Sequence, residues 1–174
     1  MNQELSIHVV IRELERNGNI FQELLTGMEK SQYTWRADEE SWSLLEIICH
    51  LFDEEVEDFR PRMQHLFDGN KGMFSPIDPP AWVEDRKYME QDFEERIAAF
   101  LREREASLHF LEKHISSDWA QHIVHPRVGA IYPRDLMMNW LAHDYLHLRQ
   151  ITKLKYDMTS KLGGVDISYA GVWK

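Results

Sequence analysis

Apolar residues recur every three or four positions along four separate stretches of the chain, which is the spacing of one face of an α-helix. The stretches lie within residues 7–28, 44–59, 85–113 and 133–156. No stretch alternates apolar and polar residues in the manner of a half-buried β-strand. Because a helix with one apolar face buries that face against another element, the pattern predicts an all-α bundle of four helices.

Local signals indicate where some of these helices begin and pack. Ser43, followed three residues later by Glu46, forms a capping box that predicts a helix start at Leu44. Pro133 suits the first position of the last helix, because it lacks only an amide hydrogen that would be unpaired there. Gly18 lies on the apolar face of the first helix, where it lowers helix stability, so we expect a neighbouring helix to approach closely at this point.

Length and composition predict one domain over residues 1–174, with 43% hydrophobic and 29% charged residues. The connections over residues 69–82 and 116–132 are predicted to be irregular. A formal net charge of −10 disfavours binding to nucleic acid or to anionic membranes, and no apolar run approaches the roughly 20 residues of a membrane helix. The N-terminal residues lack the pattern of a secretory signal, and a single cysteine, Cys49, excludes an internal disulfide. We therefore expect a cytoplasmic protein without nucleic-acid or membrane partners.

Two histidines, His143 and His147, lie four residues apart in the last predicted helix. At this spacing both rings project from one side of the helix, about 6 Å apart along its axis. The HExxH proteases bind zinc through such a pair, although the glutamate of that motif is absent here. Asn139 and Gln150 lie beside the pair on an otherwise apolar face. The pair indicates either a metal site or two structural or surface histidines.

A zinc or nickel site generally has a third protein ligand, and His50 is the candidate. His50 lies opposite the most apolar face of its helix, among acidic residues. That position indicates either a surface histidine or the wall of a pocket open to water. Glu54, one turn further along, is then a candidate fourth ligand or general base. The acidic stretch DEEVED, residues 53–58, is predicted to form a solvated helix face.

Two segments of the chain resemble the DinB-like superfamily. WSLLEIICHLFDEE, residues 42–55, resembles the second helix of that family, and LAHDYLHLRQI, residues 141–151, resembles its fourth-helix HxxxHxxQ signature. The resemblance implies an up-down-down-up four-helix bundle that covers nearly the whole chain. It also implies one divalent metal ion, nickel, zinc or iron, held by His50, His143 and His147.

The resemblance further implies a metal-dependent enzyme that acts on a small molecule, because similar proteins include thiol-dependent S-transferases. We expect either a transferase that uses a low-molecular-weight thiol as co-substrate or a hydrolase. A metal ion on three neutral imidazoles keeps its double positive charge and an open position, and so activates a water or a thiol near neutral pH. Glu54 is the candidate proton acceptor, and Gln150 is the candidate residue that orients a ligand or a histidine. The alternative is a metal-bearing bundle without turnover that serves as a binding or stress-response module.

A second apolar strip on the last predicted helix consists of Met137, Leu141, Tyr145 and Leu148, away from the histidines. A helix that is apolar on two sides is usually buried on two sides. The strip predicts contact with a neighbouring helix and, for the remainder, a homodimer surface, which similar proteins often have.

Overall fold

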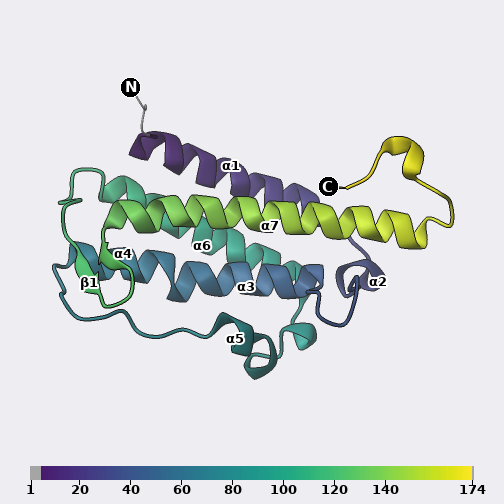
Figure 1. Ribbon diagram of the computed structural model, residues 1–174, viewed down its shortest axis with the longest axis horizontal. Coiled ribbons are helices and arrows are strands. Elements are labelled where there is room, and N and C mark those ends of the chain that lie inside the picture. Colours follow the sequence, from purple (N-terminus) through teal and green to yellow (C-terminus); the bar gives the residue numbers. More distant parts are fainter. Residues whose placement is uncertain (1–4, 174) are drawn as a thin grey trace.

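Four long helical segments lie side by side in the computed structural model, which describes residues 5–173 (Figure 1). They are α1 (Ile7–Leu25), α3 (Leu44–Glu57) with its continuation α4 (Phe59–Phe67), α6 (Phe93–Lys113) and α7 (Pro133–Leu162). In Figure 1, α1 and α7 run in one direction, and α3–α4 and α6 run in the opposite direction. This arrangement confirms the expected up-down-down-up bundle. The single-domain prediction for residues 1–174 includes residues 1–4 and 174, which lie outside the described part.

Short elements fill the connections. They are α2 (Lys30–Tyr33), α5 (Pro79–Asp85), η1 (Tyr88–Glu90), the strands β1 (Ile123–His125) and β2 (Gly129–Ile131), and η2 (Ser168–Ala170). The two strands form an antiparallel hairpin in which Val124 lies opposite Ala130. Strands of three residues are too short for alternation to be seen in the sequence, which explains why the hairpin was not expected.

The predicted helix starts at Leu44 and Pro133 are confirmed. The hydroxyl of Ser43 accepts a hydrogen bond from the Glu46 amide at 3.3 Å, and a Glu46 carboxylate oxygen accepts one from the Ser43 amide at 2.8 Å. The helix that follows is interrupted at Asp58, whose backbone is not helical (φ −113°, ψ −88°). Pro61 accounts for the break, because its ring would clash with the carbonyl three to four residues earlier in a continuous helix.

Three helix boundaries differ from the prediction. α6 begins at Phe93 rather than near residue 85, because Lys87 has a left-handed backbone (φ 49°) and Asp92 caps a new helix through the amide of Glu95 at 2.8 Å. α5 occupies the end of the connection 69–82 that was predicted to be irregular, and its prolines stand in the first turn, where a missing amide hydrogen is tolerated. α7 continues to Leu162 rather than ending near residue 156.

Most of the acidic stretch 53–58 is buried, and the prediction of a solvated face is wrong except at Glu57, which is exposed. Asp53 and Glu54 are each 5% exposed and Glu55 is 1% exposed. Asp53 accepts a hydrogen bond from the Tyr88 hydroxyl and pairs with Arg86, and Glu55 pairs with Arg104. The cations that make burial possible come from distant parts of the chain, so the local sequence does not reveal them.

Two apolar cores are stacked along the bundle. One gathers around Phe21, Ile48, Phe100 and Ile151, and the other around Leu14, Met63, Leu111 and Trp140. In each long helix the residues between the two cores are polar and buried: Asn17, Glu55, Arg104 and Asp144. We call these four residues the polar layer.

Gly18 faces the polar layer. A Cβ atom at this position would lie 3.3 Å from Cγ of Arg104 in α6. The close helix approach that the sequence predicts is thereby confirmed, and the approaching group is the aliphatic stem of an arginine.

The second apolar strip of α7 is largely explained within the chain. Met137 and Leu141 are buried in one core, and Leu148 packs against the other. Tyr145 is exposed and donates a hydrogen bond to Glu13 at 2.9 Å. The strip therefore gives little support to a homodimer, whose existence stays a prediction.

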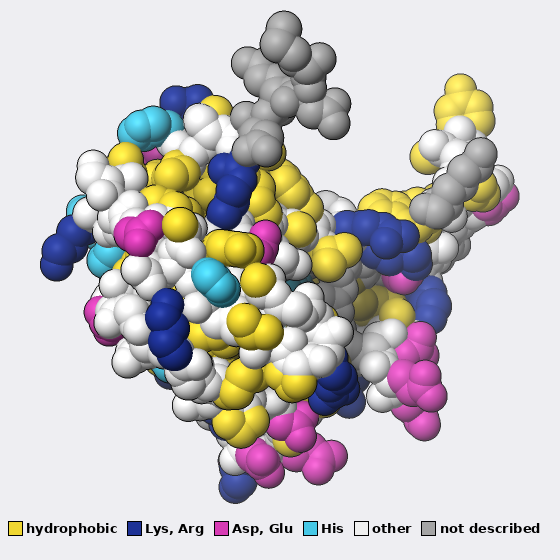
Figure 2. Space-filling model, turned by 60° about the vertical axis from the view of Figure 1, so that its left-hand side comes forward, with side chains coloured by type: hydrophobic (Ala, Val, Ile, Leu, Met, Phe, Trp, Pro, Cys, Tyr) yellow, Lys and Arg dark blue, Asp and Glu magenta, His cyan; other side chains and the backbone are white. Residues whose placement is uncertain are grey.

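The hairpin end of the bundle and the C-terminal segment carry exposed apolar side chains. Figure 2 views the hairpin end, where hydrophobic side chains are interrupted by polar, charged and histidine side chains. The segment after α7 stands away from the body in both views. Trp173 returns to pack on Tyr156 of α7, with a ring separation of 5.5 Å. Across residues 5–173, no helix combines the length and hydropathy that crossing a membrane requires.

Candidate metal centre

Three imidazole rings meet between α3 and α7. Nε2 of His50 lies 3.2 Å from Nε2 of His143, which lies 3.1 Å from Nε2 of His147. One potential ligand atom from each residue lies within 4.8 Å of the others. The structure thus brings together the three histidines that the sequence singles out, although 93 positions separate His50 from His143. His50 is 5% exposed, so the surface alternative is excluded for this residue.

The protons of these rings show why the cluster fits a cation. Nδ1 of His147 lies 2.8 Å from Oε1 of Gln150 and donates to it, which leaves a lone pair on Nε2. Nε2 of His143 faces both other rings, and a neutral nitrogen either donates one proton or accepts one. No choice of neutral tautomers therefore gives both contacts a good hydrogen bond. A cation that accepts all three lone pairs removes the conflict, and nitrogen ligands of a tetrahedral zinc ion lie about 3.3 Å apart.

Burial keeps the three rings uncharged. Loss of hydration, together with the neighbouring imidazoles, lowers the pKa of His50 to about 3 and that of His143 to about 2. Burial also lowers the pKa of His147, although the hydrogen bond with Gln150 acts in the opposite direction. The rings are therefore neutral near pH 7, the state in which imidazole binds metals.

Glu54 and Gln150 contact the outer nitrogens of two of these rings. Gln150 holds Nδ1 of His147, as described above. A carboxylate oxygen of Glu54 lies 3.8 Å from Nδ1 of His50, a buried nitrogen that has no hydrogen-bond partner among the described residues. Burial, together with the nearby Asp58 carboxylate, raises the pKa of Glu54 to about 8. Glu54 thus stands on the far side of the His50 ring from Nε2. Asn139, predicted beside the pair, is exposed and donates to the backbone of Asp135 instead.

A cleft of about 350 Å³ opens beside the cluster. His50 and His147 line it, and Gln150, Trp42 and Lys153 form part of its walls. The Trp42 and His50 rings are 5.0 Å apart, and Lys153 pairs with Asp157 across one turn of α7. The volume lies within the range of about 300–1,000 Å³ that small-molecule sites occupy.

The cleft walls include residues that sequence reasoning missed. Neither the connection 69–82 nor the connection 116–132 lines this cleft. The connection just before α3 does, and it contributes Ala37, Glu40, Ser41 and Trp42. Lys153 could have been found, since it lies three residues after Gln150 and so on the same helix face. Trp42 lies next to the helix cap, at the start of the segment that resembles the DinB-like superfamily, and nothing in the sequence indicated that it lines a cleft.

Comparison with known proteins places the fold and the family. A family model described as the DinB superfamily matches residues 13–151. Curated proteins give no match. Among solved structures, the chain is similar to YfiT from Bacillus subtilis, described as a probable metal-dependent hydrolase with an unusual four-helix bundle topology; the TM-score is 0.77 at 18% identity, over 91% of this chain and 92% of that one. It is also similar to TT2238, a four-helix bundle protein, with a TM-score of 0.53 at 17% identity over 87% and 99% of the two chains. At these identities the two structures support the fold, and the family match covers most of the sequence. The chain therefore belongs to the DinB superfamily.

Proposed function

We propose that this protein binds one divalent metal ion through His50, His143 and His147 and uses it to act on a small molecule in the adjoining cleft. The observation that carries the proposal is the meeting of three uncharged Nε2 atoms that no set of neutral tautomers can satisfy. The description of YfiT as a probable metal-dependent hydrolase supports a hydrolase. The resemblance of residues 42–55 and 141–151 to the DinB-like superfamily, which includes thiol-dependent S-transferases, supports a transferase with a low-molecular-weight thiol.

The chain's own residues would prepare such a reaction. Gln150 fixes the ring of His147 with its lone pair toward the cluster. Trp42 offers an aromatic wall for an apolar part of a substrate, and Lys153 and Asp157 offer opposite charges further along the cleft. A bound nickel, zinc or iron ion would supply a Lewis acid that acidifies a water or holds a thiolate. Access from the cleft to His50 and His147 favours an enzyme over a metal-bearing bundle without turnover that serves as a binding or stress-response module.

Elemental analysis tests the metal site. We expect about one equivalent of nickel, zinc or iron in the purified protein, and metal content near background in His50→Ala and His147→Ala, since two ligands rarely hold such ions. His109→Ala is the matched control, because His109 is exposed on α6 and should leave metal content unchanged. Equal metal content in all four proteins would end the site hypothesis. Screens for thiol consumption with electrophilic acceptors and for hydrolysis then separate the two reaction classes.

Substitution of Glu54 tests its role. We expect Glu54→Ala to lower metal affinity about 10- to 100-fold, the usual effect of removing an outer partner of a ligating histidine. Glu54→Gln should keep most of the affinity, because its amide oxygen keeps an acceptor near Nδ1 of His50, which lies 3.8 Å from the Glu54 carboxylate. If Glu54→Gln keeps its full metal content but has no turnover, Glu54 has the proton-accepting role predicted from the sequence. Unchanged metal content and turnover in both variants would remove Glu54 from the mechanism.

We propose a cytoplasmic homodimer with a small-molecule substrate and no nucleic-acid or membrane partner. The support is the net charge of −10 and the behaviour of similar proteins. Sedimentation of the purified protein measures its oligomeric mass, and a monomer at micromolar concentration would remove the dimer.

A further inference from the structure

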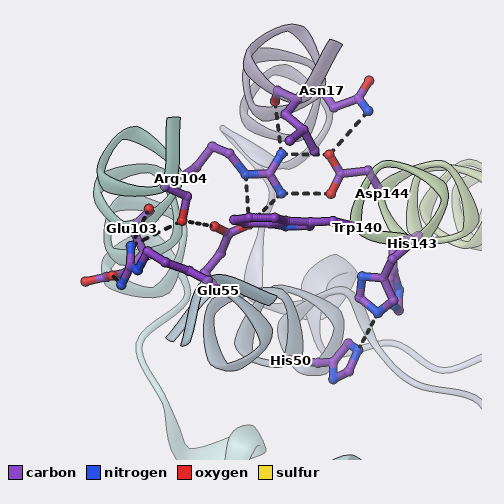
Figure 3. Close-up of polar contacts among 12 residues, drawn as sticks. Asn17, His50, Glu55, Glu103, Arg104, Trp140, His143 and Asp144 are labelled. Atoms are coloured by element: carbon purple, nitrogen blue, oxygen red, sulfur yellow. Dashed lines mark hydrogen bonds and ion pairs between the residues drawn. The ribbon is translucent and has the colours of Figure 1, made fainter. Parts of the chain in front are cut away.

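The polar layer crosses the bundle at the level of the histidine cluster. Each long helical segment contributes one member: Asn17 from α1, Glu55 from α3, Arg104 from α6 and Asp144 from α7 (Figure 3). Arg104 stands at the centre. Its guanidinium contacts both carboxylates and also donates to the backbone carbonyl of Leu14 at 2.9 Å. The layer therefore connects all four helices.

Every contact of the two carboxylates comes from a hydrogen-bond donor. Asp144 accepts from Arg104 at 2.6 and 2.8 Å and from the Asn17 amide at 3.2 Å. Glu55 accepts from Arg104 at 2.8 Å, and the Ser107 hydroxyl and the Trp140 indole donate to it at 2.6 and 3.0 Å. Burial raises the pKa of Glu55, and the neighbouring Arg104 guanidinium and the hydrogen bond from Ser107 act in the opposite direction.

The layer holds an excess of negative charge. One guanidinium (+1) faces two carboxylates (−2), so the formal charge of the layer is −1. Asp144 is 0%, Glu55 1% and Arg104 2% exposed, so water screens this charge little. The nearby Arg60 donates to Ser107 but pairs with its own carboxylate, Glu103, so it does not offset the excess.

The layer also reaches the histidines. Asp144 directly follows His143 in α7. The Trp140 indole, held by Glu55, stacks on Phe59 with ring centroids 5.4 Å apart, and the Phe59 ring meets that of His143 at 5.4 Å and 60°. Figure 3 shows Trp140 lying between the arginine and α3, with His143 beside it. The ring of His143 thus rests against a surface that Glu55 keeps in place.

We propose that Glu55 and Asp144 act as positioning residues for the metal centre: their excess negative charge raises its affinity for a divalent cation, and Glu55 fixes the packing against His143. The inference rests on the proposed metal site. Three neutral imidazoles bring no charge to offset a doubly charged ion, and transfer of an ion into a buried site is costly without an opposite charge nearby. The polar layer supplies that charge without contacting the ion.

The test compares zinc affinity at pH 7, measured by chelator competition, in Glu55→Gln, Asp144→Asn and the control Glu103→Gln. The first two remove one buried charge each with almost no change of shape, and Glu103 is the partly exposed partner of Arg60. We expect the first two variants to bind zinc about 10- to 100-fold more weakly, as outer partners of metal sites do, and the control to match the unsubstituted protein. Circular dichroism in the presence of chelator shows which variants fold. If only one of Glu55→Gln and Asp144→Asn folds, its zinc affinity alone decides the test.

A loss of affinity in the variants could come from the missing charge or from a changed set of metal ligands. The absorption spectrum of the cobalt-loaded proteins distinguishes these two causes. We expect the same ligand-field bands in the variants as in the unsubstituted protein, reached at higher cobalt concentration. Folded variants with unchanged zinc affinity would overturn the proposal, as would an equal loss in Glu103→Gln. If the unsubstituted protein binds neither zinc nor cobalt, or if His147→Ala binds them as tightly, the metal site itself fails.

Discussion

Replacement of Arg104 by methionine is expected to destabilise the metal-free protein by about 3–5 kcal/mol, the cost of breaking a buried ion pair from one side. The substitution keeps an unbranched side chain beside Gly18 but leaves Glu55 and Asp144 buried without a cation. Urea unfolding at pH 7 in chelator, followed by circular dichroism, measures the change. Arg60→Met is the control, because its pair with Glu103 is partly exposed and should contribute about 1 kcal/mol or less.

The pH dependence of the stability of Arg104→Met tests whether the two unpaired carboxylates cause the loss. Its stability relative to the unsubstituted protein should recover as the pH falls, because protonation neutralises the two carboxylates that have lost their partner. A loss at pH 7 no larger than that of Arg60→Met would contradict the view that the polar layer depends on this guanidinium.

The metal-free Glu54→Gln variant is expected to lose about 4 kcal/mol of stability between pH 7 and pH 5. His50 and His143 have folded pKa values of about 3 and about 2, against 6.5 for a free histidine. Below pH 6.5 the unfolded chain therefore binds protons that the folded protein does not, so stability is lost as the pH falls. At pH 5 each histidine contributes about 2 kcal/mol of this loss. Urea unfolding at several pH values measures it.

The unsubstituted protein is the control for this prediction, because it keeps Glu54, whose titration acts in the opposite direction to that of the histidines. The folded pKa of Glu54, about 8, lies above the ordinary 4.5, so between these values the folded protein holds a proton that the unfolded chain releases. This group adds stability as the pH falls and offsets part of the histidine effect. We expect the unsubstituted protein to show a smaller change than Glu54→Gln. If the stability of metal-free Glu54→Gln is the same at pH 7 and pH 5, the histidines accept protons in the folded state and the prediction is wrong.

Much of the fold could be predicted because its signals are local. Apolar spacing located the four helices, and the cap at Ser43 and the proline at 133 fixed two of their starts. His143 and His147 were paired correctly because one helix turn determines their relation. His50 needed the family resemblance, since the sequence alone left both a surface and a pocket position open.

The polar layer could not be predicted, because its contacts depend on how helices are rotated and offset against one another. Arg104 lies 49 positions from Glu55 and 40 from Asp144, and each of the three looks like an ordinary surface charge in its own helix. Trp42 reaches the cleft for the same reason: the connection before α3 is brought there by the packing of α3 against α7.

The arrangement of charges between the two apolar cores restricts sliding of the helices. A shift of α3, α6 or α7 by a single turn, about 5.4 Å, would move a carboxylate or the guanidinium into one of the apolar cores and leave its former partners buried without a counter-charge. The helices of the bundle consequently have one strongly preferred axial register relative to one another. The ring from α3 is then held opposite the two rings from α7 before any ion arrives, so binding need not draw the helices together.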